Sequence, residues 1–325
     1  MAENGIQEQL TKYLTDAHSI EEQGLAQLEV APRMAGDPEL ARIFQEHLEE
    51  TRGHESQTRA RLEALGDDPS KIKDVVMKVG GTGFLLFAKV QPDTPGKLVA
   101  HAYSYEHLEL AAYELLGRVA ERAGDDETVQ IAKSIRDQEQ AMAERLESNF
   151  DRSVTASLEE VGREDMMEQL RKYLADAHAI EAQAITLLEK GPELASDPEL
   201  PSLFDEHLVE TRDQQELVDA RLDALGGSPS KLKDLAMKAG AINWGSFFAA
   251  HPDTPGKLVA FAYAFEHLEI AGYEQLRRVA EVAGDGETAD VAARILEQER
   301  AAAGKLAASF DRAAGASLRA QGITV

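Results

Sequence analysis

The chain consists of two copies of one segment, and this repeat constrains its fold more than any other feature. The string EHLEETR at Glu46 recurs as EHLVETR at Glu206, and PDTPGKLVA at Pro92 recurs at Pro252. Both pairs have the same offset, 206 − 46 = 160 residues. Solenoid repeats are much shorter, roughly 20–50 residues, so this period indicates a duplicated domain. We predict one domain over residues 1–155 and a second over residues 165–325.

Each copy has the pattern of four long helices. In the first copy we expect them at about 6–33, 38–65, 94–124 and 126–150. Gly36-Asp37-Pro38 supplies a helix stop, an N-cap and a proline at the first helical position, and Asp125 or Asp126 caps the fourth helix. The connection between the second and third helices is long, with a short helix expected near 70–79, whereas the other connections are short.

No segment alternates between apolar and polar residues with a period of two, so no sheet is expected. A four-helix bundle with one long crossover between its middle helices is the ferritin-like arrangement. We therefore predict an all-α fold of two tandem ferritin-like four-helix bundles, each with a long crossover between helices 2 and 3. The alternative is an ordinary bundle with a long middle loop, and the two differ in what fills the core.

Glutamates occupy inward-facing positions on all four predicted helices. Glu106 and Glu109, for example, lie one turn apart on the apolar stripe of the third helix. The inward Glu21 recurs in the second copy, whereas its neighbour Glu22 becomes Ala182. The full set in the first copy is Glu21, Glu50, Glu106, Glu109 and Glu139, and in the second copy it is Glu181, Glu210, Glu266, Glu269 and Glu299.

Five buried carboxylates require partner cations, because a buried unpaired ion costs several kcal/mol. No inward lysine or arginine lies near them in the stripes, so bound divalent metal ions are the expected partners. Oxygen-rich ligation favours iron or manganese over structural zinc. Two alternatives remain at this point: the acids are solvated on helix faces assigned to the wrong side, or they form a protonated network without metal.

Histidines accompany these acids. His54 lies one turn beyond Glu50 on the same helix face and is a candidate ligand, but Gln214 takes its place in the second copy. We interpret the remaining inward histidines as hydrogen-bond partners that orient carboxylates. They are His18 and His47 in the first copy, and His178 and His207 in the second.

A tyrosine follows the third-helix acids by one turn in each copy, at Tyr113 and Tyr273. These tyrosines are either core aromatics or hydrogen-bond donors to the site. Gln214, which takes the place of His54 in the second copy, is predicted to lie next to the ligands and not to be one of them.

Composition excludes several classes of protein. The chain has 59 acidic and 34 basic residues, a formal net charge of −25, which argues against binding to nucleic acid or to anionic membranes. It has no cysteine, which excludes disulfides, thiolate zinc sites and cysteine nucleophiles. With no secretory signal or membrane-spanning run in the sequence, we expect a cytoplasmic protein. The duplication further predicts an intramolecular pseudo-dimer, with further homo-oligomerisation open.

The strings EHLEETR, YEHLELAAYE and DAHSIEEQ resemble the YciE/YciF-type ferritin-like family, a group of bacterial stress-associated proteins with a carboxylate-bridged dinuclear metal site. The spacing Glu106-x-x-Glu109 is also similar to the third helix of rubrerythrins. The resemblance implies that the inward glutamates of both copies are ligands to two divalent ions per bundle, with iron the first choice and manganese the second. The fourth helix departs from the usual Glu-x-x-His, because Met142 and Ala302 stand where that pattern has histidine.

These features predict a dinuclear non-haem metal protein that reacts with dioxygen or hydrogen peroxide, with ferroxidase, peroxidase or catalase-like turnover as the candidate reactions. The alternative is a structural or interaction protein of the stress response, in which the metal only stabilises the bundles.

Overall fold

The computed structural model describes residues 2–67, 94–159, 161–162, 164–194, 197, 200–228 and 254–324. Among these residues all regular structure is helical, so the predicted all-α class is confirmed. The chain divides into two compact units, residues 1–158 with 322–325, and residues 159–321. No helix in the described ranges is both long and apolar enough to cross a bilayer.

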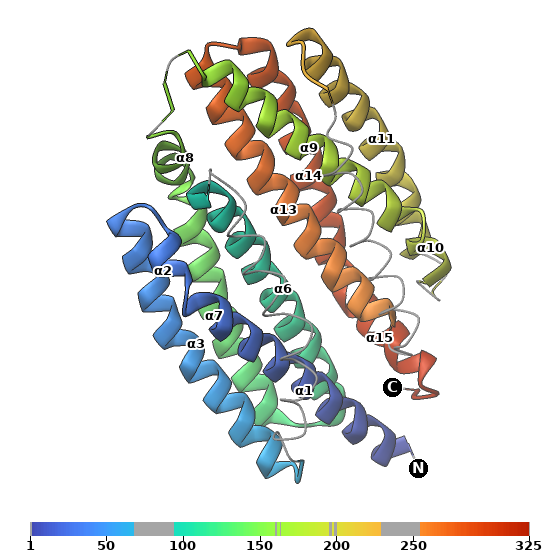
Figure 1. Cartoon of the computed structure of the whole chain (residues 1–325). Coiled ribbons are helices and arrows are strands. Elements are labelled where there is room, and N and C mark those ends of the chain that lie inside the picture. The colour runs from blue at the N-terminus through green and yellow to red at the C-terminus, as the bar shows by residue number, and fades with distance from the viewer. Residues whose placement is uncertain are drawn as a thin grey trace. The chain divides into compact units, whose positions relative to one another are not determined.

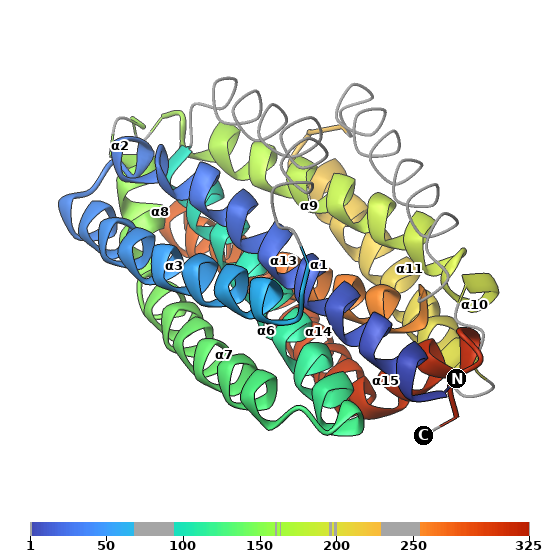
Figure 2. The same ribbon diagram turned by 90° about the horizontal axis from the view of Figure 1, so that it is seen from below.

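The first unit is a four-helix bundle, visible as the blue-to-green helices of Figures 1 and 2. Its first and fourth long helices each pack on both of the others, which produces a closed ring of four. The bundle helices are α1 (Ala2–Leu28), α3 (Pro38–Ala64), α6 (Thr94–Ala123) and α7 (Asp126–Glu147), with the short α2 (Ala31–Met34) and α8 (Phe150–Leu158) at their ends.

The second unit repeats this arrangement with the same neighbours in contact. Its bundle helices are α9 (Met166–Leu188), α11 (Leu200–Ala224), α13 (Thr254–Ala283) and α14 (Gly286–Ala308), with the short α10 (Gly191–Leu194) and α15 (Phe310–Ala320). The two tandem bundles are therefore as predicted. Most of each connection between the second and third bundle helices, and the short helix expected near residues 70–79, lie outside the described residues.

The predicted start of α3 is confirmed in detail. Asp37 accepts hydrogen bonds from the backbone N–H groups of Glu39 and Leu40, at 2.8 and 3.0 Å, and Pro38 is the first helical residue. Gly36 has a φ of +68°, and a Cβ there would lie 2.6 Å from Pro95 Cγ, so only glycine fits this turn.

The first helix ends earlier than the predicted residue 33, at Leu28, and α2 follows. The reason is Pro32, which lacks an N–H and whose ring clashes with the carbonyl four residues earlier, that of Leu28. The second copy has the same relation, because α9 ends at Leu188 and Pro192 follows four residues later. The fourth helix, predicted over about 126–150, ends at Glu147, and the short α8 begins at Phe150.

The inward face of α3 changes from apolar to polar at the middle of the bundle. Leu40 and Phe44 are buried near one end and Leu62 near the other. Between them the buried positions at spacings of three and four are polar: His47, Thr51, His54 and Thr58. The fold thus places a polar layer where a bundle of this kind ordinarily has a continuous apolar core.

Candidate metal centre

Four buried glutamates and two buried histidines meet in the polar layer of the first bundle. The acids come from α1 (Glu21), α6 (Glu106 and Glu109) and α7 (Glu139), and each is at most 3% exposed. The histidines, His47 and His54, come from α3 and are 1% exposed. This burial excludes the alternative in which these acids are solvated surface charges.

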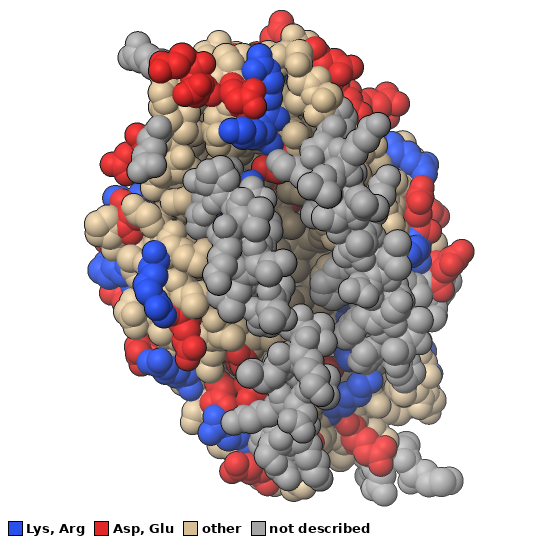
Figure 3. All heavy atoms as spheres, viewed as in Figure 1, with Lys and Arg blue, Asp and Glu red and all other residues tan. Residues whose placement is uncertain are grey.

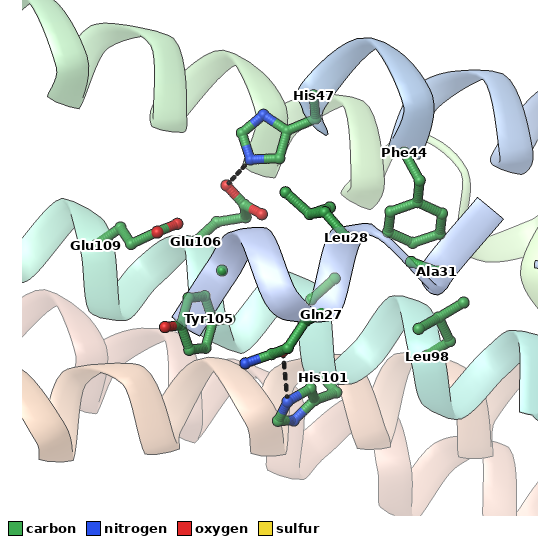
Figure 4. A pocket seen from close by; sticks show the side chains of 12 residues that line it. Gln27, Leu28, Ala31, Phe44, His47, Leu98, His101, Tyr105, Glu106 and Glu109 are labelled. Carbon is green, nitrogen blue, oxygen red and sulfur yellow. Dashed lines mark hydrogen bonds and ion pairs between the residues drawn. The ribbon is translucent and has the colours of Figure 1, made fainter. Parts of the chain in front are cut away.

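His47 faces two of these acids. Its Nε2 lies 3.2 Å from Glu106 Oε2 and 3.5 Å from Glu139 Oε2, and Figure 4 shows the contact with Glu106. The Nδ1 of the same ring lies 3.0 Å from Glu50 Oε2. Glu50 in turn accepts a hydrogen bond from Arg145 at 2.6 Å, and its side chain is 34% exposed. Glu50 therefore lies behind His47, and the histidine, not this glutamate, faces the centre.

His54 has the same two-sided arrangement on the other side of Glu139. Its Nδ1 lies 2.7 Å from Glu139 Oε1 and 3.7 Å from Glu21 Oε2. Its Nε2 lies 3.3 Å from Gln138 Oε1, an acceptor, so Nε2 carries a proton. Nδ1 faces the acids: in the protonated ring it donates to Glu139, and after loss of that proton its lone pair can bind a cation. Tyr113 donates a short hydrogen bond to Glu21 Oε1 and is thus a donor to the site.

Two sets of ligand atoms, each lying within 4.8 Å of one another, result from these contacts. They share one residue, Glu139, whose two oxygens point to different histidines. The first set is His47, Glu106, Glu109 and Glu139, and the second set is Glu21, His54 and Glu139.

The second bundle reproduces the first of these sets. His207 Nε2 lies 3.0 Å from Glu266 Oε2 and 3.5 Å from Glu299 Oε2, and Glu269 completes a group within 4.8 Å. Glu210, 39% exposed, lies 3.3 Å from the other ring nitrogen of His207, as Glu50 does behind His47.

The rest of the second bundle's centre differs. Tyr273 donates a short hydrogen bond to Glu181, as Tyr113 does to Glu21. Gln214, which is fully buried, stands in the place of His54 and donates to Gln298 Oε1 at 3.4 Å.

His18 and His178, predicted to orient carboxylates of the centre, form hydrogen bonds with other residues. His18 Nδ1 lies 3.1 Å from Thr58 Oγ1, and its Nε2 lies 3.9 Å from a carboxylate oxygen of both Glu22 and Glu55. His178 lies 2.6 Å from Asp219. The sequence predicts Glu50 as a ligand and His47 as its hydrogen-bond partner farther from the centre. In the structure His47 faces the core acids, and Glu50 lies on the outer side of the histidine.

The electrostatics of the metal-free core favour protonated acids. Burial, together with the charge of Glu139, raises the pKa of Glu21 from 4.5 to about 8. Burial also raises the pKa of Glu106 to about 7, although the charge of His47 opposes this shift. Burial raises the pKa of Glu109 well above its ordinary value.

Glu139 is the exception in the first bundle. Burial acts to raise its pKa, but the hydrogen bond from His54 and the charge of His47 outweigh burial and lower it. In the second bundle, where no histidine occupies the position of His54, burial and the charge of Glu269 raise the pKa of Glu299 well above its ordinary value.

Several core carboxylate oxygens have no hydrogen-bond partner among the described residues. They include Glu21 Oε2 and Glu109 Oε1 in the first bundle, and Glu181 Oε2 and both oxygens of Glu269 in the second. A buried acceptor without a partner is costly, and the same oxygens are suitable ligands for a divalent cation. The donor set of carboxylates with one or two imidazoles fits iron or manganese.

Surface acids are in a different environment. On the face in Figure 3, acidic side chains are interspersed with basic ones. Arg42, for example, lies 2.5 Å from both Glu39 and Glu46. Such surface acids have arginine partners, whereas the charged partners described for the core glutamates are histidines.

A small pocket reaches the centre of the first bundle between α1, α3 and α6. His47, Glu106 and Glu109 line its inner end, and Gln27 and His101, 3.1 Å apart, lie farther along it (Figure 4). The centre of a water-sized molecule can occupy about 20 Å³ within this pocket, which is enough for one such molecule. A second pocket reaches His207 and Glu266 in the second bundle.

Comparisons with known proteins identify the family of the chain. The model of the family DUF892, described as a domain of unknown function, matches residues 5–159 and again 165–318. Protein YciF of Escherichia coli K12 is 28% identical over 144 residues, which cover 42% of this chain and 84% of YciF. No solved structure matches. The predicted YciE/YciF-type resemblance is confirmed, and the chain belongs to the DUF892 family, of which it carries two domains in tandem.

Proposed function

We propose that the chain is a non-haem metal protein that binds iron or manganese in the core of its bundles and reacts there with dioxygen or hydrogen peroxide. One observation carries the proposal: eight glutamates, four in each bundle, are at most 3% exposed and converge with histidines, while several of their oxygens lack a hydrogen-bond partner. A divalent cation supplies the charge and the contacts that these groups lack.

The protein's own contribution is positioning. Glu50 and Gln138 fix the ring orientations of His47 and His54, and Tyr113 holds one oxygen of Glu21. Residues that form hydrogen bonds with metal ligands, without binding the metal themselves, tune the affinity for the metal and the geometry of the site. Redox-active ions in such a site supply the electrons for cleavage of an O–O bond.

A reaction with dioxygen or peroxide also requires that the small molecule can reach the residues of the centre. The pocket beside His47 and Glu106 has room next to these residues for one molecule of about the size of water, dioxygen or peroxide. The surrounding apolar side chains, such as Leu28 and Phe44, limit the entry of bulk water.

The test is oxygen and peroxide consumption by protein loaded with ferrous iron. We expect the native chain to consume either oxidant faster than free iron at the same concentration. A variant that carries Glu139→Gln and Glu299→Gln is the matched control, because it changes one buried acid in each bundle at nearly constant volume. Equal rates for the native chain and this variant would contradict the proposed reaction. Bound metal and a raised melting temperature without turnover would favour the structural alternative.

A further inference from the structure

The polar layers of the two bundles differ at two positions on the second long helix, because Thr58 is replaced by Val218 and one histidine by glutamine. His54 in α3 corresponds to Gln214 in α11, and both side chains are at most 1% exposed. Their surroundings are otherwise alike: Gln138 and Gln298 receive the hydrogen bond of the respective side chain, and a tyrosine holds Glu21 and Glu181. The exchange of imidazole for amide is therefore the difference between the two centres that changes a candidate ligand atom.

In the first bundle His54 completes a second set of ligand atoms. Its Nδ1 lies 2.7 Å from one oxygen of Glu139, while His47 lies 3.5 Å from the other oxygen. Glu139 thus stands between two histidines and two sets of donors. A carboxylate in this position can bridge two cations, each of which then has one imidazole and at least two carboxylates.

In the second bundle only one such set of histidine and acid ligands forms within the described residues, around His207. Glu181 and Glu299 remain in place, but the third donor is the neutral amide of Gln214, whose NH₂ group is engaged with Gln298. The remaining amide oxygen is a harder and weaker donor than imidazole toward ferrous iron. The second position in this bundle therefore lacks the nitrogen ligand that its counterpart has.

We infer that the tandem chain is asymmetric: the first bundle holds two ferrous ions bridged by Glu139, and the second bundle holds one, at His207. The inference rests on the proposed function, since it assumes that the core sites bind metal. It assigns the first bundle to chemistry that needs a pair of metal ions and leaves the second with a single-ion site.

The experiment exchanges the two residues. Metal-free full-length chain is titrated with ferrous iron under anaerobic conditions, and tightly bound iron is counted after desalting. We expect three ions per native chain, two for His54→Gln and four for Gln214→His. The double exchange restores three ions but moves the pair to the second bundle. Magnetic coupling between paired ions, followed by Mössbauer spectroscopy, reports the pair independently: it is lost in His54→Gln and regained in the double exchange.

Far-ultraviolet circular dichroism verifies that each variant retains its helices. Four ions per native chain, or no additional ion in folded Gln214→His, would overturn the asymmetry while leaving the proposed metal binding intact. No bound iron in the folded native chain would instead refute the proposed function itself, so the two failures are distinguishable.

Discussion

Removal of metal is predicted to reverse the usual dependence of stability on pH. In the metal-free protein Glu21 and Glu181 have pKa values of about 8, against 4.5 for an ordinary glutamate, because burial disfavours their charge. Between these values the folded chain binds more protons than the unfolded chain, so the free energy of unfolding falls as pH rises. The raised pKa of His47 acts in the same direction, since burial, which would lower it, is outweighed by Glu106.

The magnitude follows from the shifts. Each carboxyl with a raised pKa contributes a loss of about 1.4 kcal/mol per pH unit, and one shifted to about 8 contributes about 5 kcal/mol over the full range. In the metal-loaded protein the trend is opposite, because the ligands must lose protons to bind metal, and metal affinity rises with pH.

Equilibrium urea denaturation of chelated and loaded protein between pH 5 and pH 8 measures both trends. The matched control is Glu21→Gln with Glu181→Gln, which removes two titrating groups and reduces the slope by about 1.4 kcal/mol per pH unit for each. An unfolding free energy of the chelated native chain that is constant or rises over this range would refute the reasoning. So would an unchanged slope in the control variant.

Three further variants test individual contacts. Glu50→Gln weakens the contact that orients His47, so metal affinity, measured by competition with a chelator, should fall by about 10–100-fold. The number of ions bound at saturation should stay the same, and loss of an ion would instead place Glu50 among the ligands. Tyr113→Phe leaves Glu21 Oε1 without its donor and should destabilise the metal-free protein by about 1–3 kcal/mol in urea denaturation. An unchanged free energy of unfolding would contradict a stabilising role of this hydrogen bond. A methyl group in Gly24→Ala would lie 3.2 Å from Glu109 Oε1 and narrow the pocket, so peroxide consumption should slow at constant metal content; equal rates would exclude this entry.

Much of the fold could be predicted from the sequence because its determinants are local or repeated. The offset of 160 residues identified two domains, and Asp37 and Pro38 identified the start of α3. The early end of α1 was missed because the apolar stripe continues beyond Leu28, whereas the effect of Pro32 acts on a carbonyl one turn earlier.

The candidate centre was predictable in composition but not in orientation. Helical periodicity places His47, Glu50 and His54 within one broad face, which a sequence alone does not divide into inner and outer positions. A signal was available in Thr51 and Thr58, which continue the spacing of the buried stripe through His47 and His54 and bypass Glu50. The partner that holds Glu50 outward, Arg145, lies on another helix and is 95 residues away in sequence.

The most direct test of the account is the metal content of the full-length chain, expressed without a metal-binding tag in medium that contains iron and manganese. Inductively coupled plasma mass spectrometry is applied to the native chain and to the Glu139→Gln, Glu299→Gln variant. The account predicts bound iron or manganese in the native chain and a large loss of it in the folded variant. A folded native chain without metal, or a variant with the same metal content, would contradict the claim that the core glutamates are metal ligands.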